Sequence, residues 1–218
     1  VLAKGNRHHR LSDFRYEERP VAVQLLAKEE ARLAAAARKL ASLRPDIYDL
    51  NLGCPARQVV HGGRGAALLR NPALIARLIS ALVAAVEAPV TAKIRLGWNE
   101  DSRNHVEVAR LLAESGVAAI AVHGRTRAQH YSGMADWEAI AEVKAAVRVP
   151  VFANGDVRTV EDIDAIQRAT GCEAVMIGRG AVGNPWILQR RSIQDLSLAE
   201  RLPVIERHLR AMVDYYDE

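Results

Sequence analysis

A cysteine stands at the point where a predicted strand ends. Cys54 lies in the run Asn-Leu-Gly-Cys-Pro at residues 51–55, which overlaps the end of the predicted strand segment 47–52. Pro55 cannot donate to a β ladder, so the strand stops before it and the thiol faces a site rather than the sheet. Loops after the carboxyl ends of strands are where α/β proteins do their chemistry. A lone cysteine is more often a small buried residue, but the neighbours of Cys54 favour a chemical role.

The other predicted strand ends carry polar residues of different kinds. Each one alone has a structural explanation, such as a helix cap, a core histidine or a turn. A lysine at the end of an apolar strand, however, needs an acceptor or an anion to offset its desolvation. In a parallel barrel all these positions form one ring around the mouth. The ring consists of Gln24, Asn51 with Cys54, Lys93 with Arg95, His123 with Arg125, Asn154 with Gly155 and Asp156, and Gly178 with Arg179.

The last two strand ends have the composition of a phosphate site. The segments 154–156 (Asn-Gly-Asp) and 178–180 (Gly-Arg-Gly) follow what would be strands seven and eight of a barrel, where backbone amides often hold a phosphate. Arg179 adds a guanidinium that can donate hydrogen bonds to a phosphate, and the glycines let the backbone amides come close to it. The sequence therefore predicts a phosphorylated ligand. The Gln, Asn, Lys and His of the ring match the donors that a flavin ring requires.

Short apolar segments alternate with amphipathic ones along the chain. Such strands are typical of a parallel sheet that is covered on both faces. Six strand-helix units without a dinucleotide fingerprint favour an α/β fold of the (β/α)8 TIM-barrel type, and an open doubly wound sheet is the alternative. Strands are expected at 20–26, 47–52, 90–96, 119–123, 150–154 and 174–178, and helices at 28–43, 66–86, 106–114, 137–147, 160–170 and 198–215.

The length predicts an incomplete barrel. A whole barrel takes about 250 residues, whereas this chain has 218 and spends its last part on helix alone. We expect the first one or two strands to be missing before residue 1, because the polar segment 1–18 resembles the end of one unit leading into the next. Residues 1–190 then form the barrel domain, and residues 191–218 begin a C-terminal helical domain.

The composition is that of a soluble protein with a sizeable core. Half of the residues are apolar, 26% are charged, and no apolar run approaches the length of a membrane span. Two cysteines, Cys54 and Cys172, are too few for a disulfide framework and fit a reducing cytoplasm. No metal-ligand spacing is present, and we expect a monomer. The charge of +4 rests mostly on arginine, which permits RNA as a partner, although an Arg-rich genome composition explains the same bias.

Taken in order, the motifs resemble those of the tRNA-dihydrouridine synthases, most closely the bacterial B/C-type branch. No single motif is specific, but the combination is, and it extends from about residue 20 to residue 188. The segments that carry the resemblance are 51–55 (NLGCP) with Gly65 and Leu68, 93–98 (KIRLGW), 122–127 (VHGRTR) with Tyr131 and 135–137 (ADW), 154–156 (NGD), and 176–180 (MIGRG) with 184–186 (NPW).

The resemblance implies an activity and a set of roles. Enzymes of this family reduce uridine in tRNA to 5,6-dihydrouridine with FMN and NADPH, on an FMN-binding barrel followed by a helical domain that grips tRNA. Cys54 matches the general acid that protonates C5 of the uracil while hydride reaches C6, and the target base must be flipped out of the tRNA. Asn51 matches a residue that faces both flavin and uracil, and the family's flavin contacts are matched by Gln24, Lys93 and His123. Contacts near the ribityl phosphate are matched by Asn154, Gly155, Gly178 and Arg179. The resemblance places Arg95 and Arg125 at the substrate edge.

The sequence also departs from the family pattern, and two other functions stay open. The first flavin loop is absent, the segment 25–29 replaces a Gly-Asx turn, and the helical domain stops at Glu218. One alternative is another FMN barrel of the dihydroorotate or dihydropyrimidine dehydrogenase type, which also places an Asn and a Cys-Pro after a strand. The other is a truncated, non-catalytic remnant that keeps RNA binding or nothing.

Overall fold

The structure, a computed structural model, describes residues 14–216 and is built on one parallel sheet. Its strands pair in the order of the sequence, and each runs parallel to its neighbour. Every connection between consecutive strands contains a helix, so the chain repeats the strand-helix unit of a (β/α)8 barrel, as predicted. The strands are β1 (Ala22–Leu25), β2 (Ile47–Leu52), β3 (Val90–Arg95), β4 (Ala119–His123), β5 (Val151–Asn154) and β6 (Ala174–Met176).

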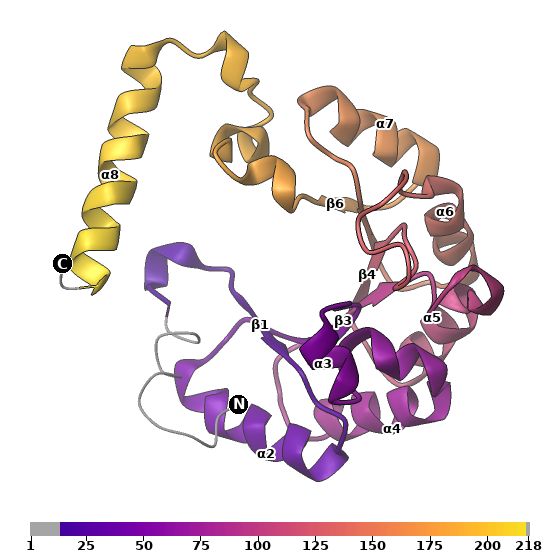
Figure 1. Ribbon diagram of the computed structural model, residues 1–218. Helices are drawn as coiled ribbons and strands as arrows, with labels where there is room; N and C mark the ends of the chain where they lie inside the picture. Colours follow the sequence, from indigo (N-terminus) through magenta and orange to yellow (C-terminus); the bar gives the residue numbers. More distant parts are fainter. Residues whose placement is uncertain (1–13, 217–218) are drawn as a thin grey trace.

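Helices cover the convex side of the sheet (Figure 1). They contact one another in chain order and are α2 (Glu30–Leu40), α4 (Pro72–Val83), α5 (His105–Glu114), α6 (Trp137–Ala146) and α7 (Val160–Thr170). Local sequence sets their ends. The hydroxyl of Thr159 accepts from the amide of Asp162 in a capping box, and Gly171 ends α7 with a φ of 66°, a left-handed conformation that favours glycine.

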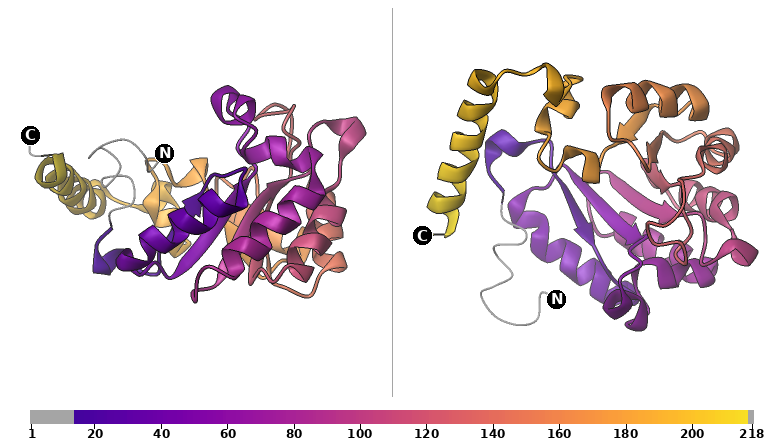
Figure 2. Two further views of the ribbon diagram at one scale, coloured as in Figure 1. Left: turned by 90° about the horizontal axis from the view of Figure 1, so that it is seen from below. Right: turned by 45° about the horizontal axis from the view of Figure 1, so that its top comes forward.

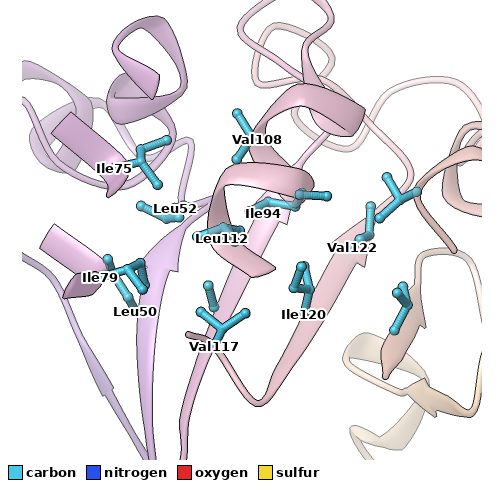
Figure 3. Close-up of a cluster of buried hydrophobic side chains, with 14 of the residues drawn as sticks. Leu50, Leu52, Ile75, Ile79, Ile94, Val108, Leu112, Val117, Ile120 and Val122 are labelled. Carbon is cyan, nitrogen blue, oxygen red and sulfur yellow. The ribbon is translucent and has the colours of Figure 1, made fainter. Parts of the chain in front are cut away.

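The apolar core lies between the sheet and this helical layer. Alternate residues of each strand point outward to the helices, as the two-residue period of a strand requires. Figure 3 shows Leu50 and Leu52 of β2 against Ile75 and Ile79 of α4, and Ile94, Ile120 and Val122 of β3 and β4 near Val108 and Leu112 of α5. All of these side chains are fully buried. The intervening residues of the same strands point to the other side of the sheet, and many of them are polar.

Two helix predictions differ from the structure. The segment 66–86, expected as one helix, consists of a 3-10 turn, η4 (Gly65–Arg70), and the helix α4. The break falls at Asn71, whose side chain caps α4 by accepting from the amide of Leu74, and Pro72 takes the first helical position. The connection before it also contains a short helix that the sequence did not predict, α3 (Arg57–His61). The remaining helices begin and end within three residues of the predicted limits.

Within the described residues, β1 and β6 are the two edges of the sheet. Residues 1–13 of the polar segment that we expected to lead into β1 lie outside the described part of the chain. After β6 the chain makes three short 3-10 turns, η6 (Arg179–Ala181), η7 (Pro185–Gln189) and η8 (Ile193–Asp195), and then forms α8 (Leu198–Tyr216). Helix α8 buries none of its residues and stands apart from the helical layer (Figure 2). No helix among the described residues is long and apolar enough to cross a membrane.

Candidate active site

The register of the sheet gathers the predicted polar residues at the carboxyl ends of the strands. Asn51 of β2 pairs with Lys93 of β3. Arg95, two residues further along β3, pairs with His123 of β4. His123 in turn pairs with Asn154 of β5. Residues in register on neighbouring strands point to the same side of a sheet, so these side chains share the concave side.

A cavity of about 260 Å³ opens at this end of the sheet. Seven of the predicted cofactor residues line it, which leaves Gln24 alone outside its wall. The cavity is lined by Lys93, His123, Asn154, Gly155, Asp156, Gly178 and Arg179, together with Tyr131, Val157, Arg158, Met176, Ile177 and Gly180.

Lys93 has the acceptor that its position requires. Its ammonium donates to Oδ1 of Asn154 at 2.9 Å. The amide of Asn154 is held in that orientation because its Nδ2 donates to the carbonyl of Met176 at 2.7 Å. Burial, together with the charge of Arg95 and against that of Asp49, lowers the pKa of Lys93 to about 8. The cavity therefore contains a cation that loses its proton close to neutral pH.

His123 is held as a neutral imidazole. Burial, with the charges of Arg95, Lys93 and Arg125, lowers the pKa of His123 to about 3. The guanidinium of Arg125 lies 3.3 Å from Nε2 of the ring. Because arginine can only donate, Nε2 must accept, and the ring proton is on Nδ1. His123 can thus offer one N–H donor without carrying a charge.

Arg125 lies in the interior, and its expected role at the substrate edge stays a prediction. It is 2% exposed, and its guanidinium donates to the carbonyls of Ser132 and Gly133 and to both carboxylate oxygens of Asp156, at 2.8 and 2.6 Å. Burial raises the pKa of Asp156, but hydrogen bonds from Arg125 and from the amide of Ala135 hold it below its ordinary value. Both oxygens of the Asp156 carboxylate therefore already accept hydrogen bonds, and Asp156 holds the guanidinium of Arg125 beside Nε2 of His123.

Arg95 is also buried. It is 2% exposed and donates through Nη1 to the carbonyls of Thr126 and His130, both at 2.8 Å. Its guanidinium lies 5.5 Å from the ring centre of Tyr131, and that of Arg179 lies 4.5 Å from the same ring. Tyr131, which is 54% exposed, is a cavity residue that the strand-end pattern missed because it lies eight positions after His123 in a loop.

The loop that carries Cys54 is organised by the side chain of Asn51. Its Oδ1 accepts from the backbone amides of Gly53 at 3.1 Å and Cys54 at 2.8 Å. Gly65 packs against the loop with a φ of 60°, and a Cβ there would lie 2.8 Å from the Cys54 carbonyl. A side chain at position 65 would therefore displace the cysteine. Cys54 itself is half-buried.

A buried acid, Asp49, is linked to the Cys54 loop through a chain of side-chain hydrogen bonds. Its carboxylate accepts from Nε2 of Gln24 at 2.7 Å and from the hydroxyl of Thr91 at 2.6 Å. Oε1 of Gln24 then accepts from Nδ2 of Asn51 at 2.7 Å. Burial raises the pKa of Asp49, against the hydrogen bonds from Thr91 and Gln24. Sequence reasoning did not single out Asp49, although an acid inside an apolar strand carries the same signal as Lys93.

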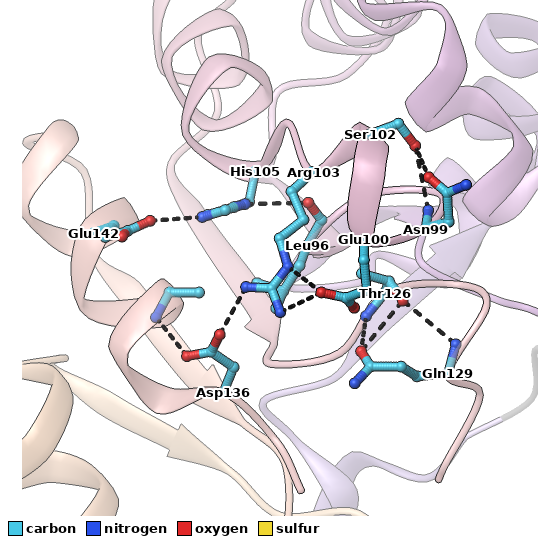
Figure 4. A network of polar contacts seen from close by, with 11 residues as sticks. Leu96, Asn99, Glu100, Ser102, Arg103, His105, Thr126, Gln129, Asp136 and Glu142 are labelled. Carbon is cyan, nitrogen blue, oxygen red and sulfur yellow. Dashed lines mark hydrogen bonds and ion pairs between the residues drawn. The ribbon is translucent and has the colours of Figure 1, made fainter. Parts of the chain in front are cut away.

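Polar contacts also fix the loops around the mouth (Figure 4). Arg103, in the connection after β3, donates to Asp136 at 2.7 Å and to Glu100 at 2.8 Å. His105 bridges the carbonyl of Leu96 and the carboxylate of Glu142. These contacts tie the connection after β3 to helix α6, so the loops that carry the site are held by groups outside it.

Comparison with known proteins identifies the family. The sequence matches the family described as dihydrouridine synthase (Dus) over residues 1–218. The chain belongs to the dihydrouridine synthase family. Its Dus relatives include tRNA-dihydrouridine synthase B of Pseudomonas aeruginosa, 47% identical over 187 residues, which are 86% of this chain and 56% of that protein. Another is tRNA-dihydrouridine synthase B of Xanthomonas campestris pv. campestris, 48% identical over 179 residues, 82% of this chain and 54% of that one. A probable tRNA-dihydrouridine synthase of Rhizobium leguminosarum bv. phaseoli is 44% identical over 209 residues, 92% of this chain and 63% of that one.

The predicted resemblance is thereby confirmed, and the chain spans about half the length of the first of these Dus relatives. Solved structures support the fold alone. A dipeptide epimerase from Enterococcus faecalis V583 aligns with a TM-score of 0.52 at 13% identity, over 71% of this chain and 38% of that one. The Amycolatopsis orientalis BexX/CysO complex aligns with a TM-score of 0.51 at 22% identity, over 75% of this chain and 59% of that one.

Proposed function

We propose that this protein is an FMN-dependent tRNA-dihydrouridine synthase, which reduces the C5–C6 double bond of uridine in tRNA with NADPH as the electron donor. The observation that carries the proposal is the Cys54 loop, fixed by Asn51 beside a cavity lined by a lysine, a neutral histidine and an arginine. The names of the Dus relatives support the same reaction.

The cavity residues fit FMN. Lys93, His123 and Asn154 offer a cation, a neutral N–H donor and an amide, which suit the carbonyls and N1 of a flavin ring. A second cavity of about 320 Å³ adjoins the first and shares Arg158, Arg179 and Gly180 with it. Two guanidinium groups at that point suit a phosphate. When bound, FMN would supply the hydride that C6 of the uracil receives.

Cys54 would supply the other hydrogen. Its S–H donates the proton that C5 of the uracil needs, so that one hydride and one proton together saturate the double bond. A neutral thiol delivers this proton without placing a permanent charge against the base. Asn51 keeps the thiol in position through the Cys54 amide, and a target uridine must leave the base stack of the tRNA to reach it.

The organisation that we propose follows the same resemblance. Residues 1–190 carry the barrel domain and residues 191–218, which include α8, begin the helical domain that contacts tRNA. We further propose a cytoplasmic enzyme that acts as a monomer.

The test measures both flavin and product. The protein is loaded with FMN, supplied with NADPH, and offered an unmodified tRNA transcript, free uridine monophosphate or dihydroorotate in separate reactions. We expect dihydrouridine in the tRNA and no turnover of the small pyrimidines. Turnover of free pyrimidines without reaction on tRNA would identify the dehydrogenase alternative. A protein that binds no FMN and reduces nothing, whether or not it binds tRNA, would be the non-catalytic remnant.

A further inference from the structure

Two arginines stack on one tryptophan at the carboxyl end of the sheet. The guanidinium carbon of Arg70 lies 4.1 Å from the ring centre of Trp98, and that of Arg127 lies 4.4 Å from it. The three residues come from the connections after β2, β3 and β4. Two backbone hydrogen bonds hold the connections after β3 and β4 together, because the amides of Arg127 and Ala128 donate to the carbonyls of Gly97 and Trp98 at 2.9 Å each. We call these three residues the Arg-Trp cluster.

The two arginines differ from their neighbours in having no acidic partner. Arg103 is paired with Glu100 and Asp136, and Arg125 is paired with Asp156. Among residues 14–216 no carboxylate oxygen lies within 4.0 Å of Arg70 or Arg127, and Nε of Arg127 is buried without a hydrogen-bond partner. Stacking on an aromatic face leaves the in-plane N–H groups of a guanidinium free for an acceptor, and a phosphate is the acceptor that this fork fits best.

The position of the cluster connects it to the candidate site. Arg70 ends the turn η4, and that turn begins at Gly65, which packs on Cys54. Trp98 follows Arg95 by three residues, and Arg127 follows Arg125 by two. The cluster therefore lies at the same carboxyl end of the sheet as the thiol, in the connections after β2, β3 and β4. Arg158 and Arg179, which line both cavities, lie in the connections after β5 and β6.

We infer that the Arg-Trp cluster binds the phosphate backbone of RNA next to the mouth of the barrel. Arg70 and Arg127 each form a charged fork to a phosphate, and Trp98 is a positioning residue that holds both side chains in place. The inference rests on the proposed function, since an enzyme that flips a base out of tRNA must grip the strand on either side of it. Phosphate contacts fix position and carry no base information, so the cluster should contribute to affinity for all tRNA sequences alike.

The experiment compares tRNA affinity of variants over a range of salt concentrations. Arg70→Ala and Arg127→Ala should each weaken binding of an unmodified tRNA transcript by about tenfold. Each should also lower the slope of log K against log salt by about 1. We expect Trp98→Ala to lose as much tRNA affinity as the double variant Arg70→Ala/Arg127→Ala. Trp98→Phe, which keeps an aromatic face, should retain most of the affinity. FMN binding and thermal unfolding of each variant establish that the fold is intact.

Arg148→Ala is the matched control. Arg148 is an exposed arginine that precedes β5, at the amino end of the strands, away from the cluster. It has no carboxylate within 4.0 Å among the described residues. It should bind tRNA like the wild type. Unchanged affinity and salt slope in Arg70→Ala and Arg127→Ala would overturn the inference, as would an equal loss in Arg148→Ala. If the arginine variants lose binding but the wild type reduces no uridine, the phosphate site stands and the proposed function fails.

Discussion

The side-chain oxygen of Asn51 accepts a hydrogen bond from the backbone amide of Cys54 at 2.8 Å, and this contact links the thiol to a buried acid. The hydrogen bonds in this link fix the orientation of two side-chain amides, those of Gln24 and Asn51. Asp49 can only accept, so it fixes Nε2 of Gln24 toward itself, which leaves Oε1 of Gln24 to accept from Asn51. Nδ2 of Asn51 must then face Gln24, and its Oδ1 must face the Cys54 amide. Asp49 is thus a positioning residue for the thiol.

Asp49→Asn tests this chain of hydrogen bonds. The asparagine offers one acceptor and one donor, so either Thr91 loses its acceptor or Gln24 must turn and present its own donors to Asn51. We expect turnover to fall by about tenfold, because a mispaired buried network costs about 1–3 kcal/mol. Stability should not fall in parallel, since a neutral amide is easier to bury than a carboxylate whose pKa burial has already raised. Single-turnover rates and urea unfolding separate the two effects, and an unchanged rate would contradict the positioning role.

Cys54→Ala should remove the proton donor and leave the cofactor site intact. The thiol lies outside the lining of the cavity. A positioned general acid contributes about 100-fold to 10,000-fold, so we expect a loss of turnover of that size with normal FMN content and normal reduction of the flavin by NADPH.

Cys172→Ala is the control for this substitution. Cys172 is buried just before β6, at the end of the sheet opposite the cavity. Near-normal dihydrouridine formation by Cys54→Ala would remove Cys54 from the mechanism, and a loss of activity in folded, flavin-loaded Cys172→Ala would contradict our orientation of the sheet.

Asp156→Asn should destabilise the fold through Arg125. Removing the carboxylate leaves a guanidinium that is 2% exposed without its counter-ion, and the loss of one partner of a buried pair costs about 3 kcal/mol. Asp164→Asn is the comparison, because its pair with Arg190 is about half exposed on both sides and exposed pairs contribute little. Equal unfolding midpoints in urea for the two variants would show that burial of Arg125 does not govern the effect.

Much of this architecture could be predicted from the sequence. Strands β2 and β4 and helix α7 occur at the predicted residues, because short, mainly apolar runs and a capping box with a terminal glycine are local signals. The register that unites Asn51, Lys93 and His123 follows from parallel pairing of strands with polar ends.

The burial of Arg95 and Arg125 could not be predicted from the local sequence. The resemblance placed both at the substrate edge, and arginines are usually exposed. The distant partners are the carbonyls of Thr126 and His130 for Arg95 and the carboxylate of Asp156 for Arg125, each more than 30 residues away in the sequence. The same limit applies to Asp49, whose partners lie on two other strands.

Lys93→Met should abolish a pH dependence of FMN binding. The ammonium is charged below its pKa of about 8 and becomes neutral above it, so affinity for an anionic ligand should fall as the pH rises through 8. For the wild type we expect the dissociation constant to rise about tenfold between pH 7 and pH 9. The Lys93→Met protein should bind more weakly at pH 7 and show almost no change. Lys144→Met, which removes a lysine paired with Glu173 away from the cavity, should keep the wild-type profile, and a wild-type profile in Lys93→Met would exclude Lys93 as the titrating group.

His123→Gln should make the fold less sensitive to acid. The pKa of His123 is about 3 in the folded protein, whereas an unfolded histidine titrates at about 6.5. Between these values the unfolded chain binds the extra proton, so stability is lost as the pH falls below 6.5. From pH 7 to pH 5 this amounts to about 2 kcal/mol of the wild-type unfolding free energy. Urea unfolding at the two pH values should show that loss in the wild type and in His61→Gln, which replaces an exposed histidine of α3, but not in His123→Gln. The same pH sensitivity in all three proteins would mean that His123 is free to take up a proton in the folded state.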